Sequence, residues 1–139
     1  MKNTVLASVG LLAASATLAE NVSGVDQMLC SVSEVTLCAE TGECFDVQAW
    51  EIDVPQFVVI DLKRKVIATT RASDVQKSTA IANFQREGGR IYLQGIEGGR
   101  AFSFVIDETT GLVTAAVARD GLSVSVFGAC TDADVRPAG

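Results

Sequence analysis

The stretch FQREGGRIYLQGIEGGRAFSFVIDETTGLVTAAVARDGLSVSVFGAC, residues 84–130, carries the strongest information about the fold. Turns that contain glycine interrupt it at regular intervals, at Gly88-Gly89, Gly98-Gly99, Glu108–Gly111 and Asp120-Gly121. The segments between these turns are short and rich in β-branched and aromatic residues. Turns spaced about 8–12 residues apart are typical of an antiparallel meander. We therefore predict an all-β domain in which about five consecutive strands cover residues 79–130.

Residue parity predicts the register of these strands. A two-residue loop at the last turn places Ala115 opposite Val126, and a four-residue loop at the turn before it places Phe104 opposite Ala115. The next loop back sets Gly95 opposite Phe102, where an aromatic ring that leans across the sheet needs a site without a side chain. A slip of one residue would turn a whole strand over, so these pairings specify one continuous apolar face. The inward side chains on this face include Phe84, Leu93, Phe102 and Phe104, which favour a filled core.

The first half of the domain adds further strands. They are expected at residues 28–38, 44–52, 57–62 and 66–70. Gly42 stands third in the loop Glu40-Thr41-Gly42, which suits a three-residue hairpin loop with a left-handed glycine. Pro55 interrupts the chain before the hairpin that turns at Lys63-Arg64-Lys65. Residues 71–78 fit either a loop or one helical turn.

The four cysteines are predicted to form two disulfides. A zinc site is excluded because the chain has no histidine and no C-x-x-C pair. Cys38 and Cys44 face each other if the loop between their strands has three residues. This leaves Cys30 to pair with Cys130, which joins the first strand to the last.

A bond between the first and last strands implies that these strands are neighbours. A meander whose ends meet closes into a barrel and leaves no exposed sheet edge. We therefore predict a small closed barrel of about eight antiparallel strands, with a β-sandwich as the alternative. The long disulfide loop should contribute about 4–5 kcal/mol to stability by restricting the unfolded chain.

The N-terminus has the pattern of a signal peptide over residues 1–19. Lys2 supplies a positive start, residues 4–18 are uncharged and apolar, and Thr17-Leu18-Ala19 offers small residues for cleavage. The apolar run is shorter than the about 20 residues of a membrane span. We expect a bacterial periplasmic or secreted protein with no membrane span after cleavage. Flexible tails are expected at residues 20–27 and 132–139, on either side of one disulfide-bonded domain over residues 28–131.

The composition argues against several classes of function. The absence of histidine excludes Ser-His-Asp and Cys-His catalysis and removes the commonest metal ligand. The net charge of −6 becomes −7 once Lys2 is removed, which disfavours nucleic acid because its phosphates attract basic clusters. We predict a monomer with no metal, no cofactor and no catalytic residues.

A few residues remain as candidate sites. Trp50 and Phe57 flank the Pro55 break and are the candidate binding surface, with core packing as the alternative. Glu51 and Asp53 lie two apart on an expected strand and therefore on one face, as a carboxylate pair of a glycan hydrolase could.

One part of the sequence resembles a known group of proteins. The segment LQGIEGGRAFSFVID, residues 93–107, with Thr110-Gly111 and the later FGACT at residues 127–131, resembles an uncharacterised family of small secreted proteobacterial proteins. The early spacing of Cys30, Cys38 and Cys44 is similar as well. The resemblance implies export and a compact β domain, and it implies no activity.

These observations favour a non-enzymatic exported binding protein. Its partner is expected to be either another protein or a small apolar ligand. An interior cavity would favour the ligand, because a small barrel can hold one small molecule. A carboxylate-dependent hydrolase that acts on envelope glycans is the alternative.

Overall fold

The computed structural model describes residues 20–133 as ten strands and one short 3-10 helix. The predicted signal peptide at residues 1–19, and residues 134–139 of the C-terminal tail predicted over 132–139, lie outside the described residues, while Asp132 belongs to the last strand. The elements are β1 (Gln27–Ala39), β2 (Cys44–Asp46), η1 (Ala49–Ile52), β3 (Phe57–Asp61), β4 (Val66–Thr69), β5 (Ser78–Ala80), β6 (Asn83–Glu87), β7 (Arg90–Glu97), β8 (Arg100–Asp107), β9 (Leu112–Arg119) and β10 (Leu122–Asp132). The all-β prediction is confirmed.

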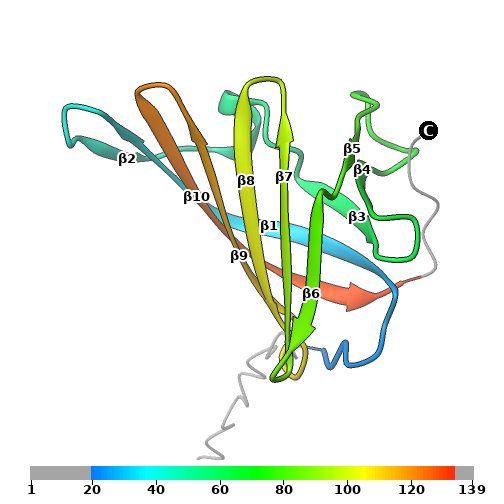
Figure 1. Cartoon of the computed structure of the whole chain (residues 1–139). Coiled ribbons are helices and arrows are strands. Elements are labelled where there is room, and N and C mark those ends of the chain that lie inside the picture. Colours follow the sequence, from blue (N-terminus) through cyan, green and yellow to red (C-terminus); the bar gives the residue numbers. More distant parts are fainter. Residues whose placement is uncertain (1–19, 134–139) are drawn as a thin grey trace, which may run out of the picture.

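All ten strands belong to one antiparallel sheet that curls into an open half-barrel (Figure 1). The strand order is β5-β4-β3-β1-β10-β9-β8-β7-β6, and β2 pairs with β1. The first and last strands do pair, from Met28 opposite Asp132 to Ala39 opposite Leu122. They lie in the middle of the sheet, however, because β3 pairs with β1 on the side away from β10 at the Gln27 end.

The closed barrel is therefore not what the structure shows. The edge strands are β5 and β6, which are consecutive in the chain and joined by Ile81 and Ala82. The Ile81 backbone NH bonds to the Lys65 carbonyl beside β4, and the Ala82 NH bonds to the Gln94 carbonyl on β7. One bent segment thus passes from one edge to the other. A closed barrel would need the edge strands β5 and β6 to pair with each other, and they do not.

The predicted register of the meander is confirmed. Ala115 faces both Val126 and Phe104, and Gly95 faces Phe102. Phe84 faces Leu93 as expected, but it is 37% exposed because β6 is an edge strand. Hairpin chemistry dictated these pairings, since each turn ends one strand and begins the next at a defined residue.

The expected strand over residues 44–52 is wrong beyond Asp46. The chain turns instead into η1, where the Gln48 backbone NH donates to the Glu51 carboxylate at 2.8 Å. Asp53 then takes a left-handed conformation, with φ of 57°. A capping box and a left-handed residue both stop an extended strand. Residues 71–77 form a loop, and the hairpin from Phe57 to Thr69 is as expected.

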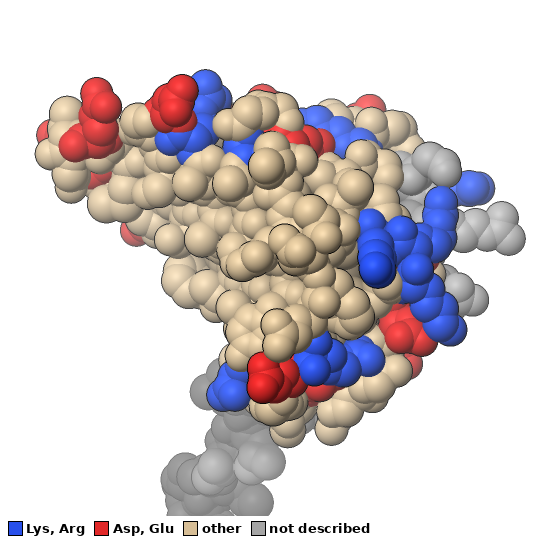
Figure 2. All heavy atoms as spheres, in the orientation of Figure 1, with Lys and Arg blue, Asp and Glu red and all other residues tan. Residues whose placement is uncertain are grey.

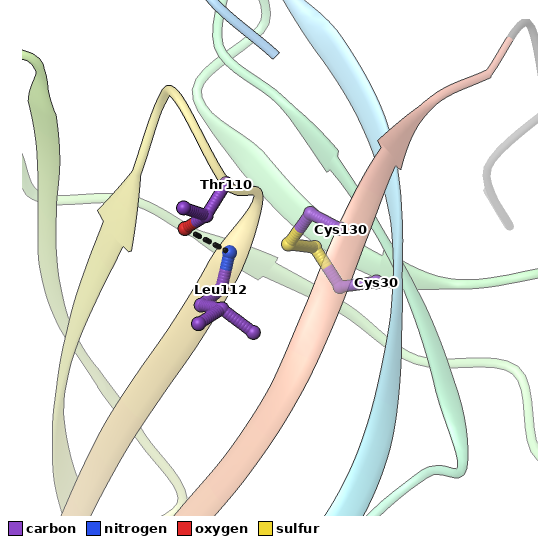
Figure 3. Close-up of a disulfide and its surroundings, with 4 residues drawn as sticks. All are labelled: Cys30, Thr110, Leu112 and Cys130. Carbon is purple, nitrogen blue, oxygen red and sulfur yellow. Dashed lines mark hydrogen bonds between the residues drawn. A yellow bond between two sulfur atoms is a disulfide. The ribbon is translucent and has the colours of Figure 1, made fainter. Parts of the chain in front are cut away.

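The disulfides are Cys38–Cys44, which residue parity predicts, and Cys30–Cys130, the pair that then remains. Each bridges residues that are direct partners in the sheet. Figure 3 shows that the turn before β9 lies beside the long disulfide. There the Cys130 NH donates to the Gly111 carbonyl at 2.7 Å, so the bridge and this turn are held together.

One end of the half-barrel is filled. Its fully buried side chains are those of Val22, Met28, Ile60, Ile91, Leu93 and Ile106. Val22 belongs to the segment expected as a flexible tail, and its NH bonds to the Glu108 carbonyl at 2.8 Å. This part of the segment therefore contributes to the core. Glu108 is itself buried and pairs with Arg86 at 2.8 Å.

Among residues 20–133, no helix is long and apolar enough to cross a membrane.

Candidate functional site

The concave face of the sheet carries an apolar groove of about 380 Å³. It lies between the inward sides of β8, β9 and β10 and those of β1, β3 and β4, and it extends from the end of the half-barrel away from the filled core down to core residues such as Phe102 and Val113. Its walls are mainly aliphatic and aromatic, and include Phe102, Phe104, Ala115, Val117, Val124 and Val126. Small-molecule sites are typically concave, mostly apolar and about 300–1,000 Å³ in volume. This groove has those properties.

Several inward-facing residues in the walls of the groove are not fully covered. Val117, Val124 and Val126 have the parity of core residues, yet they are only partly buried. Leu93 and Ile106, at the other end of the same face, are fully buried. The difference arises because the N-terminal segment packs over one end of the sheet, and the described chain has no equivalent at the other end. Strand alternation predicts which side chains point inward, but it does not predict which of them are buried in the core and which line the groove.

The floor of the groove depends on a close approach between β7 and β8. The Phe102 ring lies over Gly95, so a Cβ placed on Gly95 would stand 2.8 Å from Phe102 Cε1. The same Cβ would be 2.9 Å from the Ala80 carbonyl oxygen. Phe104 packs edge-on against the Phe102 ring, with centroids 5.7 Å apart. Gly95 thus provides the recess that holds this ring against the sheet, as the sequence predicts.

Charged side chains gather at the mouth of the groove. Arg100 and Arg119 have inward parity at the ends of β8 and β9, and both line the groove. Ala101 faces Ala118 in the register, so the next positions outward are those of the two arginines. Glu97 faces Arg100 across the hairpin and also lines the groove.

Two further charges come from the loops on the opposite wall. Asp53 follows η1, and Lys77 precedes β5. The mouth therefore has three basic and two acidic side chains, while the groove behind it has an apolar lining.

The candidate surface residues Trp50 and Phe57 are exposed, by 75% and 49% respectively. Neither lines the groove, but the residues between them, from Ile52 to Pro55, do. The Pro55 break therefore does mark part of a candidate site. The two aromatic residues stand beside it and not in it.

The two candidate acids, Glu51 and Asp53, have different surroundings. The Glu51 carboxylate accepts the Gln48 NH and caps η1, whereas Asp53 lines the groove. Within residues 20–133, no three acidic or cysteine side chains gather to form a metal site. The basic residues Lys63-Arg64-Lys65 form an exposed turn, in which the Lys63 side chain pairs with Asp26 at 3.1 Å.

Among residues 20–133, Asp107 is the group with a shifted pKa. Its carboxylate accepts hydrogen bonds from the backbone NH of Thr110 and Thr109, each at 3.0 Å, and from the Thr110 hydroxyl. These bonds, the one from the Thr110 backbone above all, lower the pKa of Asp107 from its usual value of 3.8. The residue closes the turn before β9, far along the strand from the charged mouth.

The convex face of the sheet has a different character. Its outward residues on β8 and β9 are mostly uncharged and include small side chains as well as the exposed hydrophobic residues Val105 and Leu112. Figure 2 shows this uncharged area, with charged side chains around its margins. The convex face is the outer surface of the curled sheet, and small-molecule sites are typically concave, so the groove is the better candidate for such a site.

No protein-family model, curated protein or solved structure matches this chain. The resemblance to a family of small secreted proteobacterial proteins therefore stays a prediction. The groove and its charged mouth are therefore the features of the molecule that bear on function.

Proposed function

We propose that this chain is a non-enzymatic binding protein that takes a small apolar ligand into the groove on its concave face. The observation that carries the proposal is the incomplete burial of inward-facing valines on β9 and β10. Apolar side chains gain about 25 cal/mol for each Å² removed from water. A ligand that covers Val117, Val124 and Val126 would therefore bind favourably without any rearrangement of the sheet.

The proposed compartment is the periplasm or the extracellular medium. Two disulfides are compatible with an oxidising environment, in which such bonds form and persist. The signal-peptide pattern at residues 1–19 supports the same location. An exported carrier or scavenger of apolar molecules needs no catalytic group, which agrees with the lack of histidine.

The proposal is tested with N-phenyl-1-naphthylamine, a neutral apolar dye whose fluorescence increases when it leaves water. We expect saturable binding to the purified oxidised domain. Val124→Trp fills the groove and should abolish the fluorescence increase. Ser125→Trp adds the same side chain to the adjacent residue, whose exposed side chain lies on the opposite face, and should leave binding unchanged.

A second variant distinguishes a blocked groove from a misfolded domain. Leu122→Trp obstructs the groove near its mouth, where Leu122 is less tightly packed than the core. Circular dichroism and thermal melting establish that each variant is folded. If the dye does not bind to the wild-type domain, or binds equally well to folded Val124→Trp and Leu122→Trp, the groove is not the binding site.

A further inference from the structure

We infer that the ligand of the groove is a single-chain amphiphile with one carboxylate, whose apolar chain lies in the groove and whose carboxylate contacts Arg100 and Arg119 at the mouth. This inference rests on the proposed function, which it makes more specific. Three features of the structure carry it: the two arginines, the net charge of the mouth, and the shape of the groove.

The two arginines are the first feature. They occupy neighbouring positions on β8 and β9, one residue beyond the Ala101–Ala118 pair. Like charges directly opposite each other on one sheet face destabilise the pairing of the strands. Neither arginine has an ion pair among the described residues, even though Glu97 faces Arg100 in the register. An anion between the two guanidinium groups would relieve this repulsion, and guanidinium groups bind carboxylates through paired hydrogen bonds.

The charge balance of the mouth is the second feature. Arg100, Arg119 and Lys77 contribute three positive charges, and Glu97 and Asp53 contribute two negative ones. The groove-lining side chains of the mouth therefore sum to +1 on a chain whose overall charge is −6, and Asp120 and Glu40, at the turn beside Arg119, do not line the groove. One carboxylate neutralises this charge. A phosphate monoester, with a charge of about −1.5 to −2 at neutral pH, would leave an excess of negative charge.

The shape of the groove is the third feature. Along β9 it extends from Arg119 at the mouth to Val113, which is six residues and about 20 Å at roughly 3.4 Å per residue. The groove is thus long and apolar with its charges at one end, a shape that suits an extended chain with one polar head group.

The test is displacement of N-phenyl-1-naphthylamine by ligands that share a twelve-carbon chain and differ in their head group. These are dodecanoate, 1-dodecanol, dodecyl phosphate and dodecyltrimethylammonium, each used at pH 8 below its micelle concentration or, for 1-dodecanol, below its solubility limit. We expect dodecanoate to displace the dye at a concentration at least tenfold lower than 1-dodecanol does. Dodecyl phosphate should be weaker than dodecanoate, and the cation should be the weakest of the four.

Variants then assign this preference to the arginines. Arg100→Gln/Arg119→Gln should reduce the preference for dodecanoate over dodecanol to less than threefold, with dye binding retained. Arg119→Gln alone changes an exposed residue and should reduce the preference for dodecanoate by a smaller factor than the double variant does. Arg90→Gln removes an equal charge from the opposite end of β7 and should leave the preference unchanged.

The outcomes separate this inference from the proposed function. If dye binds but dodecanoate and dodecanol compete equally, or the double variant keeps the preference, the carboxylate inference is wrong and the apolar groove stands. If dodecyl phosphate binds more tightly than dodecanoate, the head group is a phosphate and the inference is again wrong. If the dye does not bind to the wild-type domain, the proposed function itself fails.

Discussion

Replacing Gly95 with alanine should destabilise the domain and narrow its groove at the same time. The new methyl group would stand 2.8 Å from Phe102 Cε1 and 2.9 Å from the Ala80 carbonyl oxygen. Contacts between carbon atoms are normally about 3.5–4.0 Å. The Phe102 ring must therefore move by roughly 0.7 Å or more, because β7 cannot retreat from it without pressing on Ala80. The ring can move only into the groove.

The expected magnitude combines two opposing effects. Overpacking of a well-packed site costs about 1–3 kcal/mol. A Gly→Ala change at an unstrained position returns about 0.5–1 kcal/mol, because it restricts the unfolded chain. We therefore expect a net loss of about 1–2 kcal/mol in the free energy of unfolding of Gly95→Ala. For comparison, the exposed outward neighbour Gln94 should tolerate alanine within about 0.5 kcal/mol.

Urea unfolding, monitored by circular dichroism, measures this loss as a lower midpoint at unchanged slope. Phe102→Leu shortens the side chain that the methyl group meets, so a double-mutant cycle isolates the ring contact. The coupling energy between Gly95→Ala and Phe102→Leu should be about 1 kcal/mol or more. A Gly95→Ala variant as stable as the wild type, with no coupling and with dye binding intact, would refute the reasoning about the recess.

Three further results are expected. The double variant Cys30→Ala/Cys130→Ala lacks the disulfide that closes a loop of about 100 residues in the unfolded chain. It should lose about 4–5 kcal/mol in the free energy of unfolding, roughly 2 kcal/mol more than a variant without the hairpin disulfide, as measured by urea unfolding of each variant. Because the pKa of Asp107 is lowered in the folded state, its contribution is present above the unfolded pKa and is lost as the pH falls through the folded pKa. Asp107→Asn should therefore melt at a lower temperature than the wild type at pH 6, and the difference should shrink below about pH 4. Glu108→Gln removes the carboxylate that pairs with the partly buried Arg86. The free energy of unfolding should fall by about 2–3 kcal/mol, as measured by the same urea unfolding assay.

Several parts of the fold could be predicted from local sequence patterns. The turns before Leu112 and Leu122 each fix the pairing of the strands beside them, so parity alone gives Phe104 opposite Ala115. The same argument brings Cys38 opposite Cys44. These predictions succeed because hairpin pairing depends on loop length and turn type, both of which are visible in a short segment.

Other parts depend on contacts that no short segment contains. The disulfide between Cys30 and Cys130 shows that the first and last strands are neighbours, but it does not show where in the sheet they lie. The additional pairing of β1 with β3 moved both strands to the centre, and the sheet stayed open. In the same way, Arg100 and Arg119 come together only because β8 and β9 align their ends.

The sequence by itself therefore determined the all-β class, the register of the C-terminal meander, the cysteine pairing and the inward set of side chains. All of these follow from turn chemistry and from the two-residue period of a strand. Only the tertiary structure decided that the sheet is an open half-barrel with one filled end and one grooved end. That outcome depends on which segments cover an apolar face, and coverage is a long-range property that alternation along a strand does not encode.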